Sequence, residues 1–195
     1  MASQIDIVNM ALTRLGAPPI SALTEDTELA DIVEANYFGV LDALLCEHDW
    51  SFAKKKLQLA RLAVAPVNEW SYAYQLPSDR IGPPLNLYDS TGTGIRPAED
   101  YEVFGGDQVH TDYETVVCEY PFRPDESLLP AMFVQALADR LAHKLALSIT
   151  DDPGIHSVRL DEAERSLRRA KSRDDRMDAP KRLVSRVLLD ARWSC

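Results

Sequence analysis

The sequence predicts a mainly helical α+β protein, with about four helices in a bundle and a small antiparallel β subdomain inserted between the second and third helices. Apolar residues recur at helical intervals up to about residue 50 and again after residue 125. Between these regions prolines, glycines and aromatics cluster, and apolar residues alternate with a period of two. Pro180 then ends the last helical pattern. We therefore expect a helical bundle over residues 1–50 and 125–178, a β-rich platform over 51–124 and an extended arm over 179–195.

Two helices are predicted in the N-terminal part of the bundle. Ser3 and Asp6 have the spacing of a capping box, which predicts a first helix over residues 4–15, ended by Gly16. Thr27 is the expected N-cap of a second, longer helix that extends to around Glu47. Its apolar stripe is formed by Val33, Tyr37, Val40, Leu41, Leu44 and Leu45.

Two further helices are predicted after the platform. The third, Ala131–Ile149 with Pro130 in its first turn, has apolar or small residues on nearly all sides, which is typical of a central helix. The fourth is expected to run from about Ile155 to Asp175, with arginines on its outer side, at the periphery of the bundle. Its expected inner residues are Val158, Glu162, Ala163, Ser166, Leu167 and Ala170.

The platform is expected to contain one small, mostly antiparallel sheet. Gly105 and Gly106 lie between two alternating segments and predict a hairpin turn. The candidate strands are Phe52–Leu59, Tyr72–Leu76, Leu85–Tyr88, Tyr101–Phe104, Gln108–Thr111 and Thr115–Tyr120.

Composition indicates a globular protein with an uneven charge. The chain has 195 residues, of which 46% are apolar. It has neither a long apolar run nor a secretory signal pattern, so we expect a soluble protein made in the cytoplasm, without a membrane partner. Residues 159–195 hold eleven Lys/Arg against seven Asp/Glu, which leaves a net charge of −14 for residues 1–158 out of the total of −10. This acidic body is suited to letting DNA pass without adsorbing, although acidity also simply favours solubility.

The sequence contains no motif with a transferable catalytic mechanism, so we expect neither an enzyme nor a bound metal or cofactor. His143 lies in the third predicted helix, where a hydrogen-bonded core histidine is the natural interpretation. Asp151 and Asp152 could form a carboxylate pair, but before Pro-Gly they are typical of a turn. The cysteines are widely spaced and suggest neither a disulfide nor a zinc site: Cys46, Cys118 and Cys195.

Three surface candidates remain. Lys54–Lys56 could contact phosphate or could protect a strand edge from pairing. Trp70, Tyr72, Tyr74 and Tyr88 could stack bases of single-stranded nucleic acid, but packing in a core or a subunit interface suits them better because their surroundings are not basic. Arginines on the fourth helix are candidates for contacts with a neighbour. The predicted subunit-interface residues are Trp70, Tyr72, Tyr74, Arg165, Arg168 and Arg169.

The arm after Pro180 combines apolar and basic residues. Detached from the bundle, it cannot easily hide its apolar side chains, and aromatic and arginine anchors are typical of interface hot spots. It either docks onto another subunit or protein, or folds back onto its own domain. The residues expected to dock are Leu183, Val184, Arg186, Val187, Leu188, Arg192 and Trp193.

The order of these parts resembles a known family. The segment IVNMALTRLGAPPISAL (residues 7–23), followed by an acidic turn, a long helix and HDWSFA (residues 48–53), resembles the start of the bacteriophage tail tubular protein A family. YQLPSD (residues 74–79) is similar to an element of that family's middle region, and LPAMF (residues 129–133) to the start of its alanine-rich helix. The resemblance extends from Ile5 to about Asp178 and is most specific in residues 7–53.

This resemblance implies an adaptor of the head-to-tail connector: a ring of subunits, following the portal's twelvefold symmetry, at the head–tail junction of a virion. The portal protein would lie above the ring and a nozzle or tail-tube protein below it, and DNA would leave through the enclosed channel without specific binding. By analogy, the arm would dock on the portal. The alternative is a small acidic DNA-associated packaging or regulatory protein that binds DNA with basic residues of the last helix: Arg165, Arg168, Arg169, Lys171 and Arg173.

Overall fold

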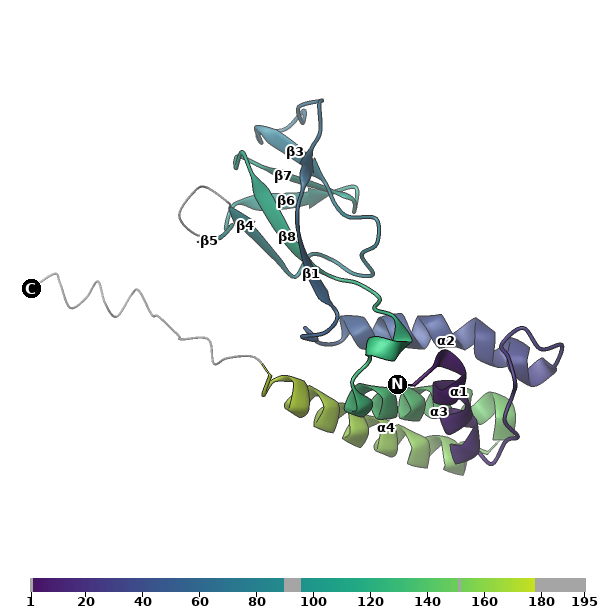
Figure 1. The fold of residues 1–195 in the computed structure, drawn as a ribbon. Helices are drawn as coiled ribbons and strands as arrows, with labels where there is room; N and C mark the ends of the chain where they lie inside the picture. Colours follow the sequence, from purple (N-terminus) through teal and green to yellow (C-terminus); the bar gives the residue numbers. More distant parts are fainter. Residues whose placement is uncertain (1, 90–95, 151, 178–195) are drawn as a thin grey trace, which may run out of the picture.

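The computed structural model describes residues 2–89, 96–150 and 152–177, and in these it shows four helices with antiparallel β-sheets inserted between the second and third (Figure 1). The α+β class predicted from the sequence is confirmed. The predicted arm over residues 179–195 lies outside the described residues. The helices are α1 (Gln4–Arg14), α2 (Glu28–Cys46), α3 (Ala131–Thr150) and α4 (Pro153–Asp174).

Capping side chains determine where the helices begin. Ser3 and Asp6 form the predicted capping box, in which the Ser3 hydroxyl accepts from the Asp6 amide at 3.2 Å and the Asp6 carboxylate accepts from the Ser3 amide at 2.9 Å. α4 begins at Pro153, two residues before the predicted Ile155. The reason is local: Asp152 is the N-cap, and proline suits the first turn because its missing N–H is not needed there.

α3 is the central helix of the bundle and packs against α1, α2 and α4. In Figure 1 it runs antiparallel to both α2 and α4. Because three helices cover it, almost its whole circumference is apolar, as the sequence predicts. Its buried residues are Phe133, Val134, Ala136, Leu137, Ala138, Leu141, Ala142, Leu145 and Ala146.

One residue predicted on the inner side of α4 is exposed. Val158 is 52% exposed, whereas Ala163, Leu167 and Ala170 are buried against the bundle. Val158 lies five residues before Ala163, which at 3.6 residues per turn places it about 140° away around the helix. Val158 therefore lies on the exposed side of α4 although it is apolar, and the prediction that it faces the bundle was wrong.

The platform contains two four-stranded antiparallel sheets among the described residues, instead of the single sheet that was predicted. The strand predicted over Phe52–Leu59 bends at Leu59 and continues in the second sheet. Period-two alternation identifies a strand but not its partner, so the division was missed. The strands are β1 (Lys54–Gln58), β2 (Ala60–Arg61), β3 (Tyr72–Gln75), β4 (Asn86–Asp89), β5 (Arg96–Pro97), β6 (Tyr101–Phe104), β7 (Gln108–Thr111) and β8 (Val116–Pro121). Their orders are β1-β8-β4-β5 and β2-β3-β7-β6.

The predicted hairpin turn joins β6 to β7. Gly105 and Gly106 have φ values of 58° and 78°, in the left-handed region that favours glycine, and the Asp107 amide donates to the Phe104 carbonyl at 3.2 Å. The platform has its own small core, separate from that of the bundle. It is formed by Leu59, Tyr74, Leu76, Leu87, Ala98, Val109, Val116, Cys118 and Tyr120.

A buried aromatic cluster joins the bundle to the platform. Trp50 follows α2, and its indole Nε1–H donates to the Leu44 carbonyl at 2.9 Å. Its ring packs edge-on against Phe133 of α3, with ring centroids 4.9 Å apart, and lies 5.7 Å from the ring of Phe52. The chain enters the platform directly after Phe52, so the direction in which the platform leaves the bundle depends on this cluster.

The chain returns from the platform beside the point where it entered. The Phe122 amide donates to the Ala53 carbonyl at 3.0 Å. The next residue, Arg123, donates from two nitrogens to the Asp42 carboxylate of α2, at 2.9 and 2.5 Å. Both crossing segments are therefore attached to the last turns of α2. A short 3-10 helix, Glu126–Leu128, then leads into α3.

Replacing Trp50 with Phe should lower the free energy of unfolding by about 1–3 kcal/mol, because it removes a buried hydrogen bond and part of a fully packed ring. The matched control is Trp70→Phe, since Trp70 is half-buried and its indole lies 3.4 Å from an exposed carboxylate; it should change stability by less than about 0.5 kcal/mol. Urea unfolding of both variants measures the difference. Equal effects would show that the cluster does not hold the junction.

Candidate functional site

The described residues contain no group of three or more His, Cys, Asp or Glu side chains that could hold a metal ion. Asp152 is used as the N-cap of α4, which is the turn role expected of it, and Asp151 lies outside the described residues. His143 is half-buried, with Nδ1 3.3 Å from the His156 carbonyl, and its ring is tilted by 42° to that of His156 with the ring centroids 4.3 Å apart. Cys118 is buried, and burial raises the pKa of its thiol to about 11. Asp152 and His143 therefore have structural partners, and Cys118 is part of the platform core.

The lysines of β1 lie on an edge strand, as predicted. Lys55 forms an ion pair with Asp79 at 3.0 Å and lies 3.9 Å from the centroid of the Phe122 ring. Lys56 lies 3.8 Å from Glu119. Because Lys55 and Lys56 already have carboxylate partners, the strand-edge interpretation fits better than a phosphate site.

The structure separates the aromatic candidates of the platform. Tyr74 is 1% exposed and its hydroxyl donates to the Tyr113 carbonyl at 2.8 Å, so it belongs to the platform core and its side chain offers no surface to a neighbouring subunit. Trp70 and Tyr72 are half-buried and keep exposed surface, and the Arg61 guanidinium lies 3.9 Å from the Tyr72 ring centroid. Trp70 and Tyr72 remain candidates for a subunit interface.

A concentration of positive charge lies along the outer side of α4. Burial of Ala163, Leu167 and Ala170 against the bundle turns the intervening positions outward. These outward residues and Met132 line a hollow of about 580 Å³. We call the basic part of this surface the arginine face: Arg165, Arg168, Arg169, Arg173 and Arg176.

Most of the arginine face has no ion-pair partner among the residues that the structure describes. Arg168 has Glu164 at 3.8 Å, a wide and exposed pair, and no described carboxylate lies within ion-pair distance of the other four. Arg165, Arg169 and Arg173 follow one another at four-residue spacing, and like charges at this spacing destabilise a helix by about 0.2–0.5 kcal/mol per pair. An anionic partner would offset this repulsion. Sequence reasoning singled out Arg165, Arg168 and Arg169 but missed the hollow, Met132 and Arg176, because these depend on how α3 and α4 pack.

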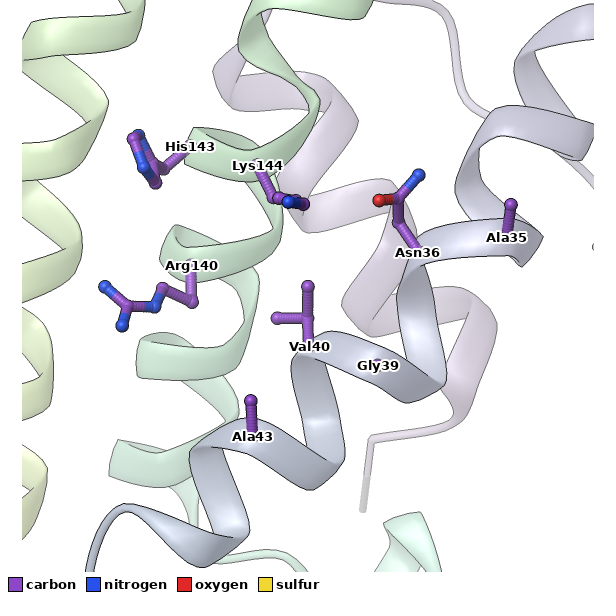
Figure 2. A pocket seen from close by; sticks show the side chains of 8 residues that line it. All are labelled: Ala35, Asn36, Gly39, Val40, Ala43, Arg140, His143 and Lys144. Carbon is purple, nitrogen blue, oxygen red and sulfur yellow. The ribbon is translucent and has the colours of Figure 1, made fainter.

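A groove of about 520 Å³ lies between α2 and α3 (Figure 2). Its α2 side is formed mainly by small residues, including Gly39 and Ala43, and its α3 side by basic residues. In Figure 2, Lys144 points toward Asn36, whereas His143 points away toward α4. The lining residues are Ala35, Asn36, Gly39, Val40, Ala43, Arg140, His143 and Lys144.

Neither the remaining predicted residues nor the comparisons with known proteins identify a functional site. All seven residues expected to dock on a portal, Leu183 to Trp193, lie outside the described residues. In the part of the chain that the structure describes, every helix is too short or too polar to cross a bilayer. The chain matches no model of a known protein family. A search of curated protein sequences also finds no match.

Replacing Gly39 with Ala should stabilise the protein by about 0.5–1 kcal/mol, because glycine within a helix costs about that much relative to alanine. An added Cβ at Gly39 meets no atom within 4 Å. Gly16→Ala is the opposite control, since the φ of +71° at Gly16 is strained for any residue with a Cβ. Thermal unfolding should show a higher Tm for the first variant and a lower Tm for the second. If Gly39→Ala instead lowered the Tm, the added methyl group would have to clash with neighbouring atoms, which would contradict an open groove at Gly39.

His143 should contribute to the pH dependence of stability. Burial lowers the pKa of His143 below its ordinary value. The unfolded chain therefore takes up a proton near pH 6.5 while the folded protein does not, so this contribution is complete above that pH and is lost as the pH falls through it. His143→Gln should lose less stability than the unmodified protein between pH 7.5 and pH 5.5 in urea unfolding. The same loss in both proteins would contradict this assignment.

Proposed function

We propose that this chain is a structural subunit of a bacteriophage head-to-tail connector. In this proposal it forms a ring between the portal and the tail nozzle or tail tube at the head–tail junction of the virion. The observation that carries the proposal is the β platform inserted between α2 and α3 of a helical bundle. That arrangement is the one implied by the resemblance of residues 5–178 to the tail tubular protein A family.

The charge distribution suits a ring that encloses a DNA channel. Residues 1–158 have a net charge of −14, and a surface of the same sign as DNA keeps the polymer from adsorbing. In the proposed ring DNA passes without specific binding. No turnover is required of such a subunit.

The arm after Pro180 is proposed to dock on the portal. Its apolar and arginine residues have the chemistry of interface anchors. If each arm occupies a groove between portal subunits, a complete groove exists only on an assembled portal, and many weak contacts add through effective concentration. A ring of twelve copies would then form on the portal, from subunits that are largely monomeric when free.

Mixing the purified chain with its portal should produce a complex with a large added mass, visible as an extra ring by electron microscopy. Deletion of Lys181–Cys195 should abolish this complex, and a Tm equal to that of the full chain would show that the body still folds without the arm. A truncated chain that still assembles on portal rings would contradict the role of the arm. An intact chain that never binds the portal would contradict the proposed function itself.

A second candidate is a DNA-associated packaging or regulatory protein, and the arginine face, on which only Arg168 has an ion-pair partner among the described residues, is the observation that favours it. This function predicts DNA binding that weakens steeply with salt, because each phosphate contact releases counterions. If Arg165, Arg169 and Arg173 contact phosphates, replacing all three with Gln should reduce the slope of log K against log salt by about three. The connector function predicts no appreciable DNA binding at physiological salt, which fluorescence anisotropy with duplex and single-stranded DNA can measure.

A further inference from the structure

The segment that contains α2 carries only acidic charge. Residues 15–53 contain no Lys or Arg. No described basic side chain lies within ion-pair distance of the carboxylates around the start of α2, and all of these except the half-buried Glu25 are exposed. We call this surface the acidic end: Glu25, Asp26, Glu28, Asp31 and Glu34.

The helix dipole accounts for only part of the acidic end. Glu28 and Asp31 lie in the first turn of α2, where the positive end of the dipole stabilises carboxylates by about 0.3–1 kcal/mol each. Asp26 precedes the N-cap Thr27, and Glu34 lies beyond the first turn, where this effect has fallen off. The acidic end therefore holds more negative charge than the capping of its own helix uses.

The start of α2 and the C-terminal end of α4 lie toward opposite ends of the bundle (Figure 1). Lys171 of α4 lies 3.2 Å from Glu47, the C-cap of α2, so this part of α4 is beside the C-terminal end of α2. α2 has 19 residues, and at 1.5 Å per residue its first turn lies about 27 Å from that end. Among the described residues no arginine of the arginine face forms an ion pair with a carboxylate of the acidic end, so the two surfaces do not neutralise one another by direct contact within one chain.

We propose that copies of this chain associate head to tail, with the arginine face of one copy on the acidic end of the next. Charge complementarity carries the proposal: among the described residues most side chains of each surface have no ion-pair partner, and a second copy supplies the opposite charge. Contacts between two different surfaces of identical subunits are heterologous and can continue from copy to copy until a ring closes. This proposal rests on the proposed function, because it takes the head-to-tail assembly to be the connector ring. The arginine face and the acidic end are then the surfaces through which neighbouring subunits of the ring contact one another.

The contact should be weak between free subunits. Exposed ion pairs each contribute only about 0.2–1 kcal/mol to association. Among the residues that line the hollow of the arginine face, Met132 is the one exposed apolar side chain, so little apolar surface adds to these pairs. Weak, charge-dominated contacts leave the free subunits soluble and dispersed. Neighbours held on a template would meet at a high effective concentration, at which the same contacts suffice.

The test is a charge exchange between two variants. Sedimentation velocity of the unmodified chain at high concentration should show growth beyond a dimer in about 0.05 M salt and dissociation in about 0.5 M salt. Arg165→Glu with Arg169→Glu, or Asp31→Lys with Glu34→Lys, should each weaken association by at least about tenfold. An equimolar mixture of the two double variants should restore association, because each then offers the charge that the other requires.

The matched controls keep the charge and change the side chain. Arg165→Lys with Arg169→Lys, and Asp31→Glu with Glu34→Asp, should associate nearly as the unmodified chain does, and circular dichroism should show the same helix content in all variants. Failure of the mixture to restore association, or an assembly that stops at a dimer, would overturn the proposal. No portal is present in this experiment, so its failure is distinct from failure of the chain to bind the portal.

Discussion

The packing of Trp50 is the interaction on which the arrangement of this protein depends. Its indole is tied to the Leu44 carbonyl at the end of α2, and its ring lies against Phe133 of α3. These two helices are separated in sequence by the whole β platform, so this buried side chain adds to the direct packing of α2 on α3 at the point where the insertion begins. The platform has its own core, and can therefore be carried at this junction without contributing to the interior of the bundle.

The position of the junction leaves particular surfaces uncovered. Both crossing segments attach near the end of α2, where Arg123 binds Asp42. The start of α2, with its carboxylates, and the outer side of α4, with its arginines, are therefore not covered by the platform. These surfaces differ in charge and lie on different helices, because α3 is central and separates α2 from α4 along most of its length. The arrangement produces a molecule with two chemically different ends.

Sequence patterns predicted the helices well because their physical signals are local. The capping box at Ser3 and the all-round apolar character of α3 determine a boundary and a burial pattern without information from elsewhere in the chain. The bend at Leu59 from one sheet into the other was not predictable, since it depends on which distant strands pair. The burial of Tyr74 depends on the same pairing. The separation of the acidic end from the arginine face likewise requires the parallel course of α2 and α4, which no stretch of sequence reveals alone.

In the proposed connector, charged rather than apolar surfaces would suit a subunit that remains dispersed before it assembles. An apolar contact is insensitive to salt and would favour association of free subunits at any time, whereas exposed charge pairs are screened and individually weak. Repulsion among the acidic bodies, with a net charge of −14 over residues 1–158, also opposes unplanned aggregation. A template that holds subunits side by side overcomes that repulsion through effective concentration. The same negative charge that keeps free subunits apart would then face DNA in the closed assembly.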